Sequence, residues 1–296
     1  MEKEVLIIGA GGRLGQELVH LYGPRALAWT RSDVDITAAE LTRAKIAALA
    51  PRLIINCAAL TAVDVAEHYP DLAFKVNALG VRNIAEAAAE VGADLVQVST
   101  DYVFDGQKGA PYTEEDPTGP VNYYGRSKLA GEYLATRSWH RTYIIRTGLL
   151  YGRFGRNYVQ AVIDDLLAGK PVTVAIDQVA SPTCTSDLAQ AIQRIATSGR
   201  YGIYHVVNEG RASRRQLAEA VRAAVSRWFP EVMKVPLRPI LLAEAGKIAP
   251  RPRDTTLSCA KIAQELAVQL RRWEEPLPEY VKYYLEHYWS GRIMGD

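Results

Sequence analysis

The chain has 296 residues, and its 35 Lys and Arg side chains against 33 Asp and Glu give a formal net charge of +2. This length corresponds to about two domains of roughly 150 residues each, or to one large α/β unit. A hydrophobic fraction of 48% allows a sizeable core and argues against disorder. The near-balance of charge argues against a nucleic-acid partner. No apolar run approaches the roughly 18 residues of a membrane span, so we expect no membrane association.

Cysteine usage and the first residues indicate the compartment. Cys57, Cys184 and Cys259 are far apart and form neither a CxxC pair nor a cluster of metal-ligand spacing. The apolar run before the first glycines is too short for a signal peptide. We therefore expect a reduced, cytoplasmic protein.

The predicted elements alternate between short β-branched runs and longer, Ala-rich helical stretches. Several of the runs are apolar throughout, as is typical of strands that are covered on both faces. Repeated strand–helix–strand units predict a parallel sheet with right-handed crossovers and helices on both faces, a Rossmann-type doubly wound α/β fold. The expected strands are residues 5–8, 26–30, 53–56, 95–99, 143–146, 172–176 and 203–207.

The alternation indicates how the chain divides into domains. Residues 71–91 and 123–137 are expected to be helical, and residues 106–120, rich in Gly, Pro and acidic residues, to form a surface loop. After about Gly210 the alternation stops and Pro-interrupted helical sequence follows. We therefore expect a dinucleotide-binding domain of residues 1–151 plus about 172–210. A smaller, mostly helical substrate domain would hold about 152–171 plus 211–296.

A glycine-rich turn follows the first strand and precedes an apolar helix. It reads Gly9-Ala10-Gly11-Gly12-Arg13-Leu14-Gly15. Such a turn allows close approach of the backbone to a pyrophosphate, which then lies at the helix N-terminus, where free N–H groups and the helix dipole favour anions. The alternative is a strand-to-helix turn with no ligand, but its place directly after the first strand favours dinucleotide binding.

The ends of the second and third strands bear on the choice of cofactor. A carboxylate after the second strand is typical of NAD binding, and a basic residue of NADP binding. This chain has Arg31 there, with Asp33 and Asp35 close behind, so NADPH is favoured and NADH is left open. The third strand ends in small residues, Cys57-Ala58-Ala59, which would let the cofactor approach.

Tyr124 and Lys128 lie four residues apart and would share one face of a helix. A free phenol has a pKa near 10, which is high for proton donation at neutral pH. A lysine cation roughly 4 Å away contributes about 4 kcal/mol at an effective dielectric constant near 20, which lowers the phenol pKa by up to about 3 units. This pair therefore predicts a general acid for carbonyl reduction.

Thr100 strengthens that interpretation, because it ends the fourth strand. Ligands of open α/β sheets bind beyond the carboxyl ends of the strands. A hydroxyl there would hydrogen-bond the same carbonyl oxygen as Tyr124. The alternative has Thr100 as a cap and Tyr124 as a packing aromatic, but the glycine turn in the same chain favours a shared catalytic site.

With these residues in place, the chain resembles the dTDP-4-dehydrorhamnose reductases, a family of the extended short-chain dehydrogenase/reductase superfamily. The glycine turn and residues 56–64 are shared with sugar-nucleotide epimerases, whereas the 100–106 run, Asp177-Gln178 with residues 181–183, and Arg251-Pro252 are more particular to the reductases. The other matching segments are residues 33–37, 76–78, 124–128, 131–132, 146–147, 151–152 and 204–205.

The resemblance implies NAD(P)H-dependent reduction of the C4 ketone of a dTDP-4-dehydro-6-deoxy sugar, dTDP-4-dehydro-L-rhamnose to dTDP-L-rhamnose. It implies Thr100, Tyr124 and Lys128 as the catalytic residues. Substrate binding would add Asp101, Asn157 and Arg251 to Thr100 and Tyr124, with Arg251 on the diphosphate. The implied cofactor-binding residues are Gly9, Gly11, Gly12, Arg13, Leu14, Gly15, Arg31, Asp35, Ile36, Cys57, Ala58, Ala59, Thr61, Tyr124 and Lys128.

The chain also departs from the family pattern. Leu149 stands where the family often has an aromatic residue that faces the sugar or base. Some members bind magnesium at a dimer contact through glutamates; Glu17 matches one such position, but Ser186 falls near another, so we expect no metal. A homodimer is left open. The alternative functions are a non-catalytic NADP-binding regulatory subunit of the same fold and a sugar-nucleotide 4-epimerase.

Overall fold

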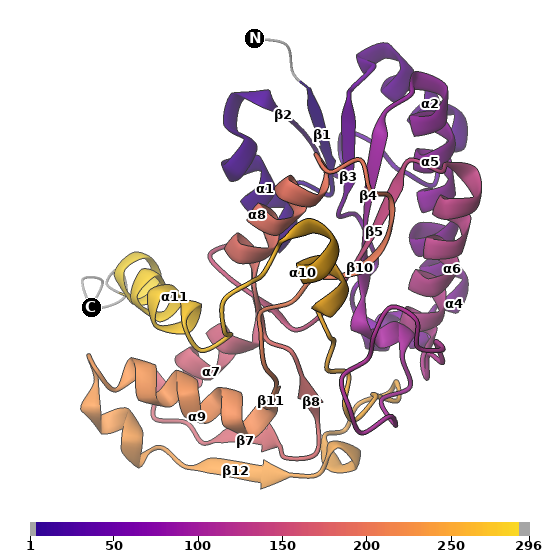
Figure 1. Cartoon of the computed structure of the whole chain (residues 1–296). Helices are drawn as coiled ribbons and strands as arrows, with labels where there is room; N and C mark the ends of the chain where they lie inside the picture. The colour runs from indigo at the N-terminus through magenta and orange to yellow at the C-terminus, as the bar shows by residue number, and fades with distance from the viewer. Residues whose placement is uncertain (1–3, 290–296) are drawn as a thin grey trace.

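The computed structural model of the chain describes residues 4–289 and contains a larger and a smaller lobe (Figure 1). The larger lobe is built on a six-stranded, fully parallel sheet in the order β2-β1-β3-β4-β5-β10. Six of the seven expected strands form this sheet. Their bounds are β1 Val5–Ile8, β2 Ala26–Trp29, β3 Leu53–Asn56, β4 Asp94–Thr100, β5 Thr142–Thr147 and β10 Gly202–His205.

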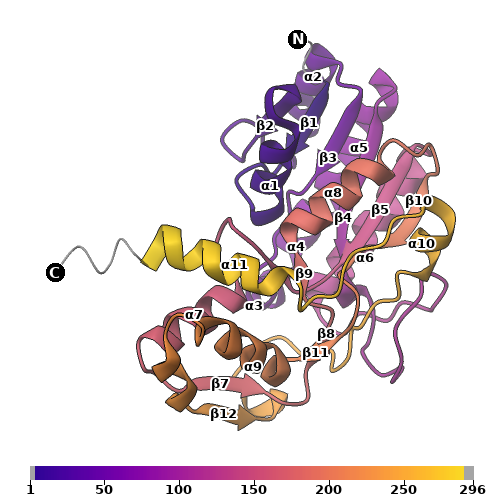
Figure 2. The ribbon, with the colours of Figure 1, turned by 60° about the vertical axis from the view of Figure 1, so that its left-hand side comes forward.

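Helices cover both faces of the sheet, which explains the continuous apolar runs. Because side chains alternate along a strand, Val5 and Ile7 pack on one face, with α1 (Arg13–Tyr22) and α8 (Thr185–Ile195). Leu6 and Ile8 pack on the other face. The helices there are α2 (Ala39–Leu49), α5 (Gly80–Val91) and α6 (Tyr123–Ser138), as Figure 2 shows. The doubly wound α/β fold expected from the sequence is confirmed.

The strand order decides where the cleft lies. The chain runs from β1 outward to β2 and then returns to β3 on the other side of β1. Crossovers on either side of this switch point lead away from each other and leave a crevice beyond the carboxyl ends of β1 and β3. The sequence predicted a doubly wound sheet but not its strand order.

The segment from 71 to 91, expected to be helical, is interrupted. It contains α4 (Pro70–Phe74), a π-helical turn (Lys75–Leu79) and α5, after α3 (Val63–His68). The turn carries the buried Asn77, whose side chain accepts from the backbone N–H of Leu60 and donates to Ser127 Oγ on α6 at 3.0 Å. The interruption therefore ties α6 to the loop after β3.

The smaller lobe has its own core. It holds α7 (Tyr158–Leu167), α9 (Arg214–Val225), α11 (Pro276–Tyr284) and a parallel pair of strands, β7 (Val172–Ala175) with β12 (Leu237–Ile240). The buried side chains of β7 pack in this core, so residues 172–175 do not belong with the sheet, where we expected them. The reason is that an apolar strand pattern does not specify the partner strand.

A second difference lies near the C-terminus. Helix α10 (Ala260–Leu266) is in the stretch assigned to the substrate domain, yet Ile262 is buried against the face of the larger sheet that α1 and α8 cover. Residues 106–120 contain no helix and no strand, as expected of a loop. The remaining short strands are β6 Leu150–Tyr151, β8 Val179–Ala180, β9 Thr183–Cys184 and β11 Ala212–Ser213.

Single turns connect these elements. They are Gly23–Arg25, Asp101–Val103, Pro230–Lys234, Leu242–Glu244 and Leu285–Trp289. Within residues 4–289, none of the helices is both long and apolar enough to cross a membrane.

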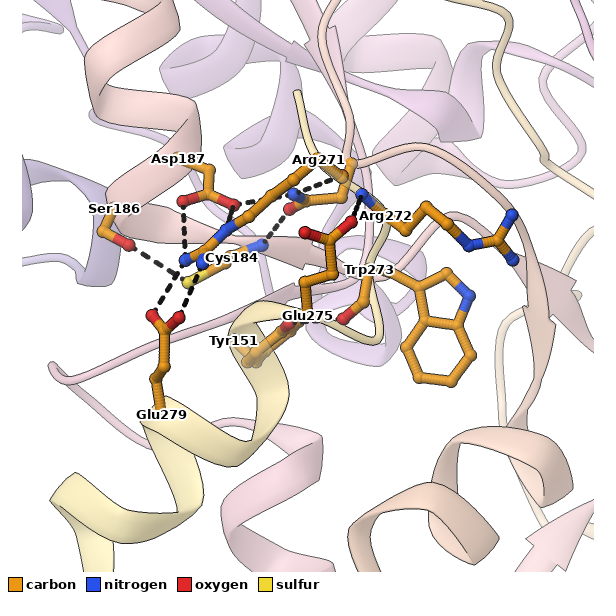
Figure 3. A network of polar contacts seen from close by, with 10 residues as sticks. Tyr151, Cys184, Ser186, Asp187, Arg271, Arg272, Trp273, Glu275 and Glu279 are labelled. Carbon is orange, nitrogen blue, oxygen red and sulfur yellow. Dashed lines mark hydrogen bonds and ion pairs between the residues drawn. The ribbon is translucent and has the colours of Figure 1, made fainter. Parts of the chain in front are cut away.

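Helix α11 is fastened to α8 by a network centred on Arg271 (Figure 3). Its guanidinium donates to both carboxylate oxygens of Asp187 (3.0 and 3.2 Å) and of Glu279 (2.6 and 2.9 Å). These hydrogen bonds raise the pKa of Arg271 and lower that of Glu279. Asn208 completes the network by donating to Asp187 at 2.7 Å.

Candidate active site

A cleft of about 970 Å³ lies beyond the carboxyl ends of the sheet, at the switch point, with walls from both lobes. Most of the residues singled out in the sequence line it. They are Gly11, Gly12, Arg13, Leu14, Gly15, Cys57, Ala59, Thr61, Thr100, Asp101, Tyr124, Lys128 and Arg251.

The glycine turn fits a dinucleotide. A Cβ on Gly9, which has a φ of +80°, would lie 2.5 Å from the backbone nitrogen of Ala58, so the first turn needs glycine. A Cβ on Gly15 would lie 2.2 Å from the carbonyl oxygen of Gly9, so this glycine lets α1 pack on the turn. Helix α1 begins after Gly12 with no side-chain cap, and its first residues line the cleft. Uncapped N–H groups at a helix start are suited to a pyrophosphate.

The structure brings Thr100, Tyr124 and Lys128 together at the cleft. Thr100 is the last residue of β4, and Tyr124 and Lys128 lie one turn apart on α6, which Asn122 caps by accepting from Gly125 N. A hydrogen bond between the Thr100 and Tyr124 side chains lowers the pKa of Tyr124. The buried Lys128 donates from Nζ to the carbonyl oxygen of Val98 at 2.6 Å.

The electrostatics of Tyr124 differ from the sequence-based argument. Burial raises the pKa of Tyr124, and the charge of Asp101 raises it further, while Thr100 and Arg13 lower it. Lys128, which the sequence suggested as the main cause of a lowered pKa, is not among the main causes of this shift, and its Nζ donates to the backbone of β4. Burial lowers the pKa of Lys128 to about 8, and Glu132 opposes that effect. In this structure the phenol is therefore firmly protonated at neutral pH.

Asp101 is a buried carboxyl beside this group. Burial raises its pKa to about 6, against hydrogen bonds donated by Thr255 (2.5 Å) and Thr100 (3.0 Å). A Cβ on Gly148 would lie 2.6 Å from the carboxyl carbon of Asp101, so glycine is needed there to make room. Leu149 lines the cleft directly after Gly148.

Other predicted cofactor residues lie outside the cleft lining. Arg31 and Asp35 are exposed beyond β2, and Asp35 accepts from the backbone N–H of Thr37 at 3.0 Å. Ile36 is buried in the core, where it contacts Gly80. Gly9 and Ala58 pack on each other behind the turn. The roles of Arg31, Asp35, Ile36, Gly9 and Ala58 in cofactor binding stay predictions.

Asn157 is the N-cap of α7 and accepts from Gln160 N at 2.9 Å, and its amide donates to Tyr280 Oη at 3.0 Å. Both polar atoms of the side chain are used within the lobe, and it does not line the cleft. In this structure Asn157 caps α7, and its role in substrate binding stays a prediction.

Arg251 does line the cleft, but it is already paired. Its Nη1 donates to Asp64 Oδ1 at 3.0 Å and to the carbonyl oxygen of Ala249 at 2.6 Å. The hydrogen bond from Arg251 lowers the pKa of Asp64.

Several cleft residues were not identified as site residues from the sequence. Tyr102, Tyr158, Gln178, Arg214 and Thr255 come from five separate segments and meet only through packing of the two lobes. Tyr102 and Gln178 lie in family-like segments, the 100–106 run and the Asp177-Gln178 pair, but no spacing in the chain signalled Tyr158, Arg214 or Thr255.

The Glu17 position, which resembles a family metal ligand, holds an ion pair. Glu17 is buried and its carboxylate accepts from Arg153. In the described part of the chain, no group of three or more His, Cys, Asp or Glu side chains is arranged to hold a metal ion.

The sequence is similar over nearly its whole length to known proteins. The family profile described as RmlD substrate binding domain matches residues 3–286. A dTDP-4-dehydrorhamnose reductase of Mycolicibacterium smegmatis is 41% identical over 288 residues, which cover 95% of this chain and 86% of the relative. The chain belongs to the dTDP-4-dehydrorhamnose reductase family.

Solved structures of the same family share the whole fold. The dTDP-4-dehydrorhamnose reductase of Clostridium acetobutylicum has a TM-score of 0.89 at 35% identity and covers 94% of this chain and 98% of its own. That of Bacillus anthracis, in complex with NADP, has a TM-score of 0.88 at 34% identity, covering 95% and 99%. The family resemblance seen in the sequence is thereby confirmed.

Proposed function

We propose that this chain reduces the C4 ketone of dTDP-4-dehydro-L-rhamnose to dTDP-L-rhamnose with NADPH. The observation that carries the proposal is the convergence of Thr100, Tyr124 and Lys128 in a cleft that the uncapped glycine turn also lines. Relatives that are 34–41% identical over most of the chain are named dTDP-4-dehydrorhamnose reductase, and the 34% identical one was solved with NADP.

The first turn of α1 and Gly11–Gly15 would hold the pyrophosphate of the cofactor. NADPH is favoured over NADH because the acids after β2 are engaged locally. Asp33 accepts from the backbone N–H of Thr30 at 2.7 Å, and Asp35 from that of Thr37. Arg31 is the exposed cation at this strand end. When bound, the dihydronicotinamide supplies the hydride.

Tyr124 supplies the proton. Its raised pKa keeps the hydroxyl protonated at neutral pH, ready to donate to the ketone oxygen. The Thr100 hydroxyl, at the same edge, orients that oxygen by a hydrogen bond. After donation, the phenolate is stabilised by Thr100 and by the charge of Arg13, the two groups that lower its pKa. Lys128 remains cationic at pH 7 and adds positive charge to the same face of α6.

Turnover with defined substrates tests the proposal. Purified protein is given dTDP-4-dehydro-L-rhamnose with NADPH or NADH, and nicotinamide oxidation is followed by absorbance. Deuterated NADPH should place deuterium on C4 of the product, which mass spectrometry and NMR detect. A silent binding subunit would bind NADPH without turnover, and an epimerase would retain its cofactor and show no net absorbance change. Either outcome would overturn the proposal.

A further inference from the structure

Arg214 enters the cleft from the smaller lobe and has no role assigned so far. It is the first residue of α9 and lines the cleft. Its Nε donates to Gln178 Oε1 at 3.2 Å, and its guanidinium carbon lies 4.8 Å from the centroid of the Tyr158 ring. The Tyr158 hydroxyl in turn donates to the backbone oxygen of Arg214 at 3.2 Å. Gln178 therefore holds the guanidinium by its Nε edge, and the Tyr158 ring packs against one of its faces.

The rest of this guanidinium is left without an acceptor. Its Nη1 is buried and has no hydrogen-bond partner among residues 4–289, and Arg214 forms no ion pair within that range. The positive charge of Arg214 lowers the pKa of the nearby Asp101 carboxyl. The oxygens of Asp101, however, already accept hydrogen bonds from Thr100 and Thr255. Buried charged donors are rarely left unpaired in a folded protein, so this one points to an acceptor on a ligand.

The position of Arg214 indicates which ligand it meets. The glycine turn and its helix lie on the larger lobe, whereas Arg214, Tyr158 and Gln178 lie on the smaller lobe. Gln178 also donates to Tyr102 Oη at 3.4 Å, one residue from Asp101, so the group lies at the substrate side of the reacting centre. The anionic part of a nucleotide-sugar is its diphosphate, and a guanidinium offers two parallel donors to a phosphate.

We propose that Arg214 binds the diphosphate of the substrate, with Gln178 and Tyr158 as positioning residues that orient its guanidinium. The inference rests on the proposed function for the identity of the substrate. Arg251, the residue that the family resemblance suggested for this role, differs in having Asp64 as a partner at 3.0 Å. Arg214, unlike Arg251, therefore brings to the cleft a charge that no ion pair within residues 4–289 neutralises.

The test compares Arg214→Gln with Arg215→Gln. Arg215 is the next residue of α9, is exposed, and pairs with Glu219 away from the cleft. With NADP⁺ saturating the cofactor site, the affinities of dTDP and of thymidine are measured by calorimetry for each protein. Arg214→Gln should weaken the binding of dTDP by roughly 10- to 100-fold and leave the affinity for thymidine unchanged. Arg214→Lys keeps the charge without the paired donors, so its affinity for dTDP should lie between those of the parent and of Arg214→Gln. The control should bind both ligands as the parent does.

Steady-state kinetics add an independent readout. In Arg214→Gln the KM for the dTDP-sugar should rise while kcat and the KM for NADPH change little. Circular dichroism checks that each variant is folded. Parental dTDP affinity in Arg214→Gln, equal losses for dTDP and thymidine, or no dTDP binding by the parent would overturn the inference. If the parent binds dTDP through Arg214 but does not reduce the dTDP-sugar, the proposed function fails and the inference stands.

Discussion

Tyr124 shows how burial and charge compete at a single residue. From the sequence, its position four residues before Lys128 predicted a phenol of lowered pKa. In the structure, burial outweighs the charges nearby, and Lys128 is turned to the carbonyl of Val98. A phenol that stays protonated suits proton donation, because the acid must carry its proton when the ketone arrives.

The first prediction concerns this proton. Tyr124→Phe should lower kcat by roughly 10²–10⁴-fold, the usual contribution of a general acid, while NADP⁺ affinity stays close to that of the parent. Tyr123→Phe is the matched control, since Tyr123 is the neighbouring phenol on α6 and does not line the cleft. Unchanged turnover in Tyr124→Phe would disprove the assignment. Stopped-flow reduction and fluorescence titration measure the two quantities.

Asp101 makes the free energy of unfolding depend on pH. Its pKa of about 6 lies above the usual value of 3.8, so the folded state holds this proton more tightly than the unfolded chain. Stability from this group is therefore lost as pH rises from about 4 to 6. Asp101→Asn removes the loss, and its stability relative to the parent should be about 2–3 kcal/mol greater at pH 7 than at pH 4.

Denaturant titrations at pH 4 and pH 7 measure this difference. Asp105→Asn is a control of opposite sign, because hydrogen bonds from Tyr112 and Gln107 lower the pKa of Asp105. Because stabilisation by a carboxyl of lowered pKa is lost only as the pH falls below the ordinary value of 3.8, Asp105→Asn should destabilise the protein by a similar amount at pH 7 and pH 4. A stability difference for Asp101→Asn that does not change with pH would contradict the prediction.

At the scale of elements, α6 is placed by its glycines. A Cβ on Gly125 would lie 2.2 Å from the carbonyl oxygen of Tyr102, and one on Gly131 would lie 2.1 Å from that of Asn77. These two contacts set the approach of α6 to the end of β4 and to the π-helical turn. They thereby fix where Tyr124 and Lys128 lie.

Gly131→Ala tests this placement. The methyl group forces α6 away from the π-helical turn, so we expect a loss of about 1–3 kcal/mol in the free energy of unfolding and a lower kcat. Gly119→Ala is the matched control, because the nearest atom to its added Cβ is 3.6 Å away. Parental stability and turnover in Gly131→Ala would show that α6 can shift without consequence. Urea denaturation and the reductase assay provide the measurements.

Helix α11 depends on the Arg271 network shown in Figure 3. Arg271→Ala removes four hydrogen bonds to Asp187 and Glu279 and should destabilise the protein by about 1–2 kcal/mol. Hydrogen exchange should be faster in α11 than in the sheet. Arg272→Ala, which removes an exposed pair with Glu274, should leave stability nearly unchanged. Equal effects of the two substitutions would count against the network.

At the scale of the whole molecule, the cleft joins two lobes with separate cores. A ligand that binds only the folded protein stabilises it by about 2.7 kcal/mol at 100 times its Kd. NADP⁺ should therefore raise Tm, and dTDP added with NADP⁺ should raise it further. Thermal unfolding with each ligand singly and together checks this. A Tm that does not respond to NADP⁺ at millimolar concentration would contradict the proposed cofactor.

The sequence-based predictions were accurate for features encoded by neighbouring residues and less accurate for features that depend on contacts between distant segments. The six sheet strands were found because two-sided burial leaves apolar runs in the sequence. The glycine turn and the Tyr124–Lys128 pair were found because their spacing is local. The strand at 172–175 was assigned to the wrong lobe, and the capping contacts of Asn157 were not foreseen, because pairing and capping depend on neighbours that no local pattern names.

The sequence alone determined the doubly wound sheet, the glycine turn and the spacing of Tyr124 and Lys128 on one helix, since each is encoded by periodicity or by spacing within one or two elements. The tertiary structure decided the strand order, the raised pKa of Tyr124 and the position of Arg214. Those properties arise when distant segments exclude water from a shared space. Desolvation and an unpaired charge exist only once that space has formed, so no local stretch of the chain specifies them.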